Sequence, residues 1–290
     1  MIFEKTYKIK HGPKAFDIDD YVKIRNEEYK KLLNNVKSEQ EIQSFFESNP
    51  SFVPGAWTPG TKSGHYPLYC SLITQPKLQG LSTKIPDFMW IATHSAGWYP
   101  TLIEIENPNK KNFKNNGVPA ADFTQAKNQL EQWRTWFNNP SNVQHFMEKY
   151  QIPDYMRNQR QMKLHMILVY GRRSEFDSNP NWSKDRLSFT SPDIEIMSYD
   201  RLSCDRELSD ALTVKLNKNN FYEAISVPPT LKLGPNSSSR LVHIEGLKKA
   251  INDNKDISKG RKSFLIERIK YWRTWVNEGE KGITSGNDYE

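Results

Sequence analysis

The chain alternates between segments with apolar residues at helical spacing and shorter segments that are apolar throughout. Helical spacing after Asp19 and again after Ser38 predicts two helices, and the second ends at Asn49-Pro50. A third helix is predicted from Asp122, a residue type that caps helices, because one stripe of the following segment is apolar. The stripe, at intervals of 3, 4, 3 and 4, consists of Phe123, Ala126, Leu130, Trp133 and Phe137.

Four segments are predicted to be strands. Residues 85–90 and 102–106 are apolar and are joined through a Gly-containing turn at 94–97, which favours an antiparallel hairpin. Residues 164–170 form a nearly continuous apolar run, as in a central strand covered on both faces, and residues 193–199 give another strand. The alternation of helices and strands predicts an α/β domain with a mixed sheet flanked by helices.

The C-terminal part has a different pattern. Residues 234–239 are rich in Gly, Pro and Ser, which predicts a linker. Two helices are predicted after it, and the second, at 262–276, is amphipathic with basic and aromatic residues. Its apolar side would dock on the main domain, or the helix would form a module for DNA contact or self-assembly. The expected organisation is therefore an N-terminal helical segment (1–37), a core domain (38–230) and a small helical appendage (240–290).

Composition and charge restrict the class of protein. Hydrophobic residues make up 36% of the 290 residues, as in a globular protein, and the net charge of +7 favours an anionic partner without identifying it. The two cysteines, Cys70 and Cys204, lack metal-ligand spacing and fit a reducing cytosol. No apolar run is long enough to cross a bilayer and no signal peptide is present, so a soluble cytoplasmic protein without membrane contact is expected.

Three carboxylates gather on the predicted hairpin. Glu104 and Glu106 share one face of their strand, roughly 7 Å apart, and Asp87 at the start of the partner strand would join them. Carboxylates this close repel one another unless a cation or a proton lies between them. Oxygen ligands at this spacing suit Mg²⁺ or Mn²⁺. The alternative is that both glutamates line the solvated face of an amphipathic strand.

The pair of Pro86-Asp87 and a strand ending in Glu104-x-Glu106 resembles the PD-(D/E)xK nuclease superfamily, whose core hairpin carries Asp and (Asp/Glu)-x-Lys. Glu106 stands in the lysine position, which is a departure from that pattern. The resemblance implies that an acidic residue on the first core helix faces the metal, and Glu41 matches that position. Glu41 also completes a capping box with Ser38, which gives it a purely structural alternative.

The resemblance further implies a role for Gln129 on the helix after the Glu104-x-Glu106 strand, where it would orient ligands. Basic residues stand beside the predicted carboxylate cluster. Lys110 and Lys111 follow the hairpin, and Arg172 and Arg173 follow the central strand. These four residues are candidates for holding a DNA backbone, with a solvated charge run as the alternative.

The order of these motifs resembles the C-terminal nuclease domain of Shedu anti-phage defence proteins over roughly residues 38–210. It includes the helix ending in Asn49-Pro50, the two hairpin strands, the Gln129 helix, the strand ending in Gly171-Arg172 and the segment 199–202. The resemblance implies a homo-oligomer that acts on phage DNA. The function predicted is metal-dependent hydrolysis of DNA phosphodiesters. The alternatives are a catalytically silent nucleic-acid-binding protein and a protein-interaction scaffold.

Overall fold

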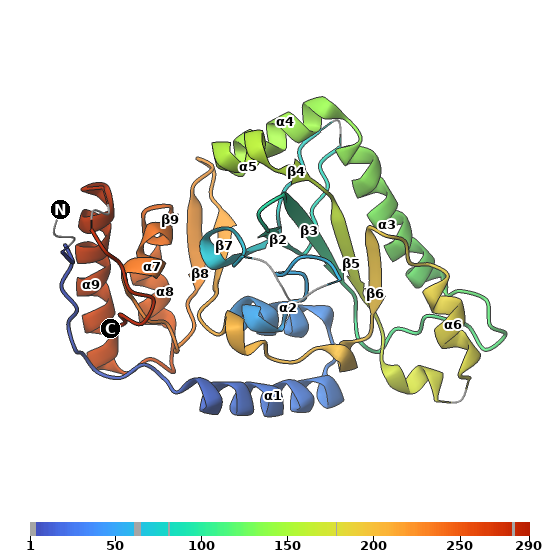
Figure 1. Cartoon of the computed structure of the whole chain (residues 1–290). Coiled ribbons are helices and arrows are strands. Elements are labelled where there is room, and N and C mark those ends of the chain that lie inside the picture. The colour runs from blue at the N-terminus through green and yellow to red at the C-terminus, as the bar shows by residue number, and fades with distance from the viewer. Residues whose placement is uncertain (1–3, 61–64, 81, 178, 280–281) are drawn as a thin grey trace.

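One mixed sheet forms the centre of the molecule (Figure 1). The computed structural model describes residues 4–60, 65–80, 82–177, 179–279 and 282–290. Within them nine strands pair in the order β6-β5-β3-β2-β1-β7-β8-β9, with β4 beside β3. The strands are β1 (Ser71–Thr74), β2 (Phe88–Thr93), β3 (Gly97–Ile105), β4 (Gln161–Met162), β5 (His165–Val169), β6 (Ile194–Met197), β7 (Leu212–Leu216), β8 (Tyr222–Ser226) and β9 (Ile244–Glu245). The predicted mixed α/β architecture is confirmed.

Helices cover both faces of this sheet. They are α1 (Ile18–Asn35), α2 (Glu39–Ser48), α3 (Ala121–Phe137), α4 (Pro140–Lys149), α5 (Asp154–Gln159), α6 (Asn181–Leu187), α7 (Pro235–Ser238), α8 (Leu247–Asp253) and α9 (Lys259–Asn277). One apolar core joins α1 and α2 to one face, and a second core joins α3, α4, α8 and α9 to the other. None of the described helices has the length and apolar composition needed to cross a membrane.

The β2–β3 hairpin contributes buried side chains to both cores. All six residues of β2 are buried, and successive side chains enter opposite cores: Phe88 and Trp90 pack toward α2, whereas Met89 and Ile91 pack toward α3. The strands pair antiparallel, and the turn closes with a hydrogen bond of 2.9 Å from the His94 amide to the Gly97 carbonyl. The predicted hairpin is confirmed, as is the central strand at 164–170, which lies as β5 between β3 and β6.

Helix α3 has the predicted buried stripe, but its cap residue lies two residues before the predicted one. Phe123, Ala126 and Leu130 are fully buried against the sheet. The helix begins at Ala121 after the cap residue Ala120, so Asp122 lies in its first turn and does not cap it. A carboxylate in the first turn still interacts favourably with the positive end of the helix dipole.

The C-terminal helices are part of the main core. The predicted linker instead contains α7, where Ser238 has no exposed surface, and β9 extends the sheet by pairing with β8. The apolar side of α9 docks on the main domain, and Leu265 and Trp272 belong to the same core cluster as β7 and β8. The part of the chain after residue 240 is therefore continuous with the sheet.

Both ends of the described chain pack against α9 (Figure 1). The Tyr7 ring lies 5.7 Å from that of Trp272, between centroids. The carboxylate of Glu290 is fully buried; it accepts a hydrogen bond of 2.7 Å from Arg268 Nε and one of 2.9 Å from Trp272 Nε1. Segments distant in sequence thus cover the outer side of this helix.

Candidate carboxylate site

The candidate site lies where β2 begins and β3 ends. The pairing of Phe88 with Ile103 continues outward to set Asp87 opposite Glu104, and directly opposed residues in a sheet have side chains on the same face. One oxygen of Asp87, Oδ2, accepts a hydrogen bond of 2.8 Å from the amide of Ile105. This bond fixes the Asp87 carboxyl group across the end of β3, next to Glu104.

Burial makes these two carboxyl groups difficult to ionise. Glu104 is only 8% exposed, and its Oε2 has no hydrogen-bond partner among the described residues. Burial, reinforced by the charge of Asp87, raises the pKa of Glu104 well above its usual range. Burial is also the main cause that raises the pKa of Asp87 to about 7, with further contributions from the charges of Glu39 and Glu106. The pair therefore holds a proton at neutral pH unless a cation takes its place.

Glu106 has a different environment from Glu104. It follows β3, and its Oε2 lies 2.6 Å from the ammonium of Lys110. Its backbone carbonyl accepts a hydrogen bond of 2.5 Å from the hydroxyl of Tyr199, which is fully buried. The pKa of Lys110 is raised, because the ion pair with Glu106 outweighs the lowering effect of burial. The carboxylate at the expected lysine position is thus neutralised by a lysine four residues later.

The acidic residue of α2 that reaches this cluster is Glu39. Partial burial raises its pKa, and the nearby charge of Glu106 adds to the effect, although part of the side chain is exposed. Glu41 is exposed, and its carboxylate accepts a hydrogen bond of 3.0 Å from the hydroxyl of Ser38. Both glutamates are exposed, but residues two apart on a helix point in different directions, so the two carboxylates lie in different surroundings. The resemblance points to Glu41, which lies at its capping contact, whereas Glu39 is the α2 glutamate whose charge acts on Asp87 and Glu104.

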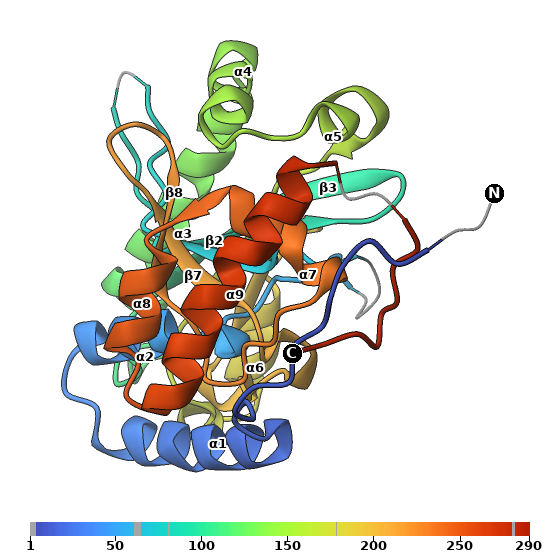
Figure 2. The same ribbon diagram turned by 90° about the vertical axis from the view of Figure 1, so that its left-hand side faces the viewer.

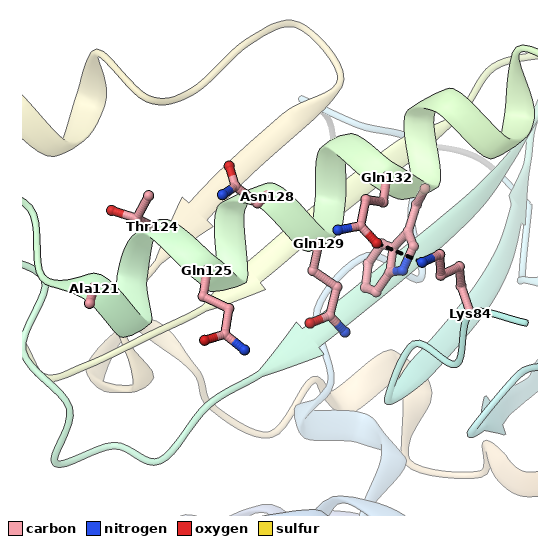
Figure 3. A pocket seen from close by; sticks show the side chains of 8 residues that line it. Lys84, Ala121, Thr124, Gln125, Asn128, Gln129 and Gln132 are labelled. Atoms are coloured by element: carbon pink, nitrogen blue, oxygen red, sulfur yellow. Dashed lines mark hydrogen bonds between the residues drawn. The ribbon is translucent and has the colours of Figure 1, made fainter. Parts of the chain in front are cut away.

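Gln129 lies in a polar groove along α3 with a volume of about 580 Å³. Figure 3 shows Gln125 and Gln129 pointing from α3 toward the strands below, and Gln132 accepting a hydrogen bond of 2.6 Å from Lys84 Nζ. Among the described residues, no hydrogen bond links Gln129 to the carboxylates. The groove offers several amide groups next to the strand ends.

Comparison with known proteins identifies the family. A family model described as "Shedu protein SduA, C-terminal" matches residues 36–203, more than half of the chain. The chain belongs to this Shedu family. Comparison with curated proteins and with solved structures gave no match. The matched Shedu segment runs from just before α2 to just after β6 and contains all three hairpin carboxylates, Glu39 and Gln129.

Of the four basic residues of the Shedu domain that are candidates for DNA binding, two form ion pairs within the described part of the fold and two do not. Arg172 donates a hydrogen bond of 2.8 Å to Asp200 and another of 2.8 Å to the carbonyl of Leu33, so its guanidinium is held within the fold. Lys110 is paired with Glu106, as described above. Lys111 and Arg173 are exposed, and their side chains have no ionic partner among the described residues. Of the four candidates, these two are available to a phosphate backbone.

The loop that carries Lys110 and Lys111 is fixed by Glu175. Its carboxylate accepts hydrogen bonds of 2.9 Å from the backbone amides of both Asn112 and Phe113. The loop also passes close to Gly171, whose φ of +65° favours glycine and where a Cβ would approach the Lys110 carbonyl to 3.0 Å. These contacts hold the basic loop beside the carboxylates of the Shedu domain.

The Shedu carboxylates suit a hard divalent cation that is held by two protein ligands and waters, and not one enclosed by protein ligands alone. No group of three or more His, Cys, Asp or Glu side chains in the described residues is arranged to hold a metal ion. Asp87 and Glu104 nevertheless face each other, and Glu104 Oε2 is buried without a partner. Mg²⁺ is commonly bound by one or two carboxylates and keeps several waters. The donor set therefore fits such an ion, with Asp87 and Glu104 as the two protein ligands.

Proposed function

We propose that this Shedu protein is a metal-dependent DNA nuclease acting in anti-phage defence. The observation that carries the proposal is the buried pair of Asp87 and Glu104, whose proton a divalent ion would replace. Buried like-charged groups raise the energy of the folded protein and occur most often at functional sites. Membership of the Shedu family supports the role in defence. The hairpin followed by the parallel strand β5 is compatible with a PD-(D/E)xK core.

In the proposed mechanism Asp87 and Glu104 would hold Mg²⁺ or Mn²⁺ at the end of the hairpin. When bound, such an ion polarises the phosphoryl group and lowers the pKa of a bound water. The Ile105 amide keeps the Asp87 carboxylate in place through its hydrogen bond. Glu106, which is paired with Lys110 and forms no three-carboxylate group with these two residues within the described part of the chain, would accept the proton of the attacking water or become a further ligand once the ion is bound.

Lys110 contributes positive charge at the position where the related pattern has its own lysine. Its ammonium, 2.6 Å from Glu106, would stabilise the negative charge that develops on the phosphoryl oxygens. Lys111 and Arg173, exposed on the adjacent surface, would contact the DNA backbone. Gln129 would orient the substrate from the groove of α3. The resemblance to Shedu proteins also implies a homo-oligomer, and assembly is therefore part of the proposal. Light scattering of the purified protein tests it.

A cleavage assay with the Asp87→Asn variant tests the proposal. Parent and variant are incubated with plasmid, linear and single-stranded DNA in Mg²⁺, in Mn²⁺ and in EDTA, and DNA binding is measured in parallel. Cleavage by the parent should require the metal, and the variant should lose about a hundredfold or more. DNA affinity should persist in the variant. A parent that binds DNA without cleaving it under any of these conditions would favour the catalytically silent alternative.

A further inference from the structure

A second cavity lies at the end of the hairpin away from the carboxylates. Its volume is about 1490 Å³, and it is bounded by the segment before β1, by α5, by the end of β2 and by residues 236–243. Asp87 precedes β2 and Thr93 ends it, so the two sites are about 20 Å apart along the strand. In Figure 2, α5, the hairpin tip and α7 lie along the same side of the molecule. The cavity is thus separate from the carboxylate site.

Positively charged side chains line this cavity in excess. Arg240 is 6% exposed and donates a hydrogen bond of 2.8 Å to Asp210, while its buried Nε has no hydrogen-bond partner among the described residues. Arg160 donates to the hydroxyl of Thr93 at 2.5 Å. Neither Arg160 nor Lys232 forms an ion pair within the described part of the chain. Uncompensated cations in a cavity attract an anionic ligand.

Aromatic rings accompany these charges. Tyr69 and Cys70 have φ angles of 54° and 46°, in the left-handed region that such residues rarely adopt. Backbone of this kind costs free energy and is concentrated at binding sites. Tyr69, held in this conformation, stacks on His243 with ring centroids 4.5 Å apart, and both line the cavity. Tyr155 on α5 is 46% exposed, and its ring lies 4.9 Å from the Arg160 guanidinium.

We propose that this cavity binds a nucleotide unit, with a base against the exposed aromatic rings and a phosphate held by the cationic side chains that line it, Arg160 and Lys232 among them. Aromatic faces beside cationic side chains are the chemistry with which proteins hold bases and phosphates. The buried guanidinium of Arg240 provides a further donor once a ligand reaches it. The unit comes either from a free nucleotide or from the end of a nucleic-acid strand. Both sources present the same chemistry to the cavity.

Isothermal titration of the full chain in EDTA tests the proposal. The probes are AMP, GMP, adenosine, inorganic phosphate and a 5′-phosphorylated pentanucleotide. A nucleotide or the oligonucleotide should bind at least about tenfold more tightly than adenosine or phosphate, because each of these lacks one half of the contacts. Binding of the oligonucleotide alone would identify a strand end as the source, and binding of mononucleotides would identify a free ligand.

Variants locate the binding to this cavity. Arg160→Gln and Lys232→Gln should each weaken it by about tenfold, whereas Lys248→Gln, on the exposed side of α8, should leave it unchanged. Tyr155→Ala supplies a further test at an exposed ring. Because the titrations are made in EDTA, a loss of binding in the Arg160 and Lys232 variants is independent of the metal-dependent cleavage proposed for Asp87 and Glu104. The inference is overturned if none of the probes binds, if phosphate binds as well as the nucleotides, or if the Arg160 and Lys232 variants bind like the parent.

Discussion

The ammonium of Lys110 lies 2.6 Å from the carboxylate of Glu106, four residues before it. Glu106 occupies the position that holds lysine in the pattern this hairpin resembles. Lys110 therefore places a positive charge next to this position, although Lys110 lies in a loop and not on the strand. Because Glu175 and Gly171 fix that loop, the ammonium is held in a defined place.

Replacing Lys110 by Met removes this charge and keeps most of the side-chain length. We expect cleavage at saturating DNA to fall by about a hundredfold, because one electrostatic stabiliser of the transition state is lost. Lys111→Met is the matched control in the same loop. It should weaken DNA affinity and reduce the slope of affinity against salt by about one, with little change in the rate at saturation. Equal effects of the two substitutions would make Lys110 only another backbone contact.

The two glutamates of α2 give a second matched pair. Glu39→Gln removes a charge that raises the pKa of Asp87, whereas Glu41→Gln alters only an exposed contact with Ser38. We therefore expect Glu39→Gln to change metal affinity and cleavage, and Glu41→Gln to leave both near the parent values. The measurement is cleavage rate against Mg²⁺ concentration. A larger effect of Glu41→Gln would show that α2 turns its other side to the substrate.

Local patterns were sufficient to predict the elements but not the contacts between distant segments. The hairpin and the stripe of α3 follow from the spacing of apolar residues within each segment, and these apolar residues are the ones that the structure buries. The resemblance points to Glu41 because of its place in the motif order, with the capping pattern of Ser38 as its structural alternative, whereas the approach of Glu39 to Glu106 depends on how α2 packs on the sheet. No nearby residue indicates that partner.

The same limit explains Arg172 and the predicted linker. Arg172 is separated by 28 residues from Asp200, which engages it, and nothing within its own segment reveals that partner. Residues 234–239 have the composition of a flexible connection, yet Ser238 is buried under elements that follow it in the chain. Composition describes a segment by itself, whereas burial is decided by what packs against it.

The raised pKa of Asp87 makes the stability of the metal-free protein depend on pH. The unfolded chain loses this proton near the ordinary pKa of Asp, about 4, whereas the folded protein keeps it up to a pKa of about 7. Since the folded state binds more protons in this window, the free energy of unfolding should fall as the pH rises through it. Urea unfolding in EDTA at pH 5 and pH 8 measures the change.

The Asp87→Asn variant isolates this contribution, because the buried His165, whose pKa is lowered mainly by burial, is present in both proteins. The parent should lose more stability between pH 5 and pH 8 than the variant does. Adding Mg²⁺ at pH 8 should stabilise the parent and have little effect on the variant, since a ligand that binds only the folded state raises its stability. Identical pH profiles for the two proteins would rule out the buried, proton-holding state of Asp87.

A chain cut after Asn236 tests whether the C-terminal helices belong to the core. The cut removes β9, α8 and α9, and with them Leu265 and Trp272, which pack in the same cluster as Val214 and Tyr222. Exposure of that apolar surface should abolish the cooperative unfolding transition of the full chain or shift it to much lower urea. In the full chain, Trp272→Ala should cost about 3–5 kcal/mol, while Lys270→Ala on the exposed side of α9 should cost little. Circular dichroism during urea titration follows all four proteins. A cut chain that unfolds at the same urea concentration as the full chain would make the segment after residue 240 an independent appendage, as its composition predicts.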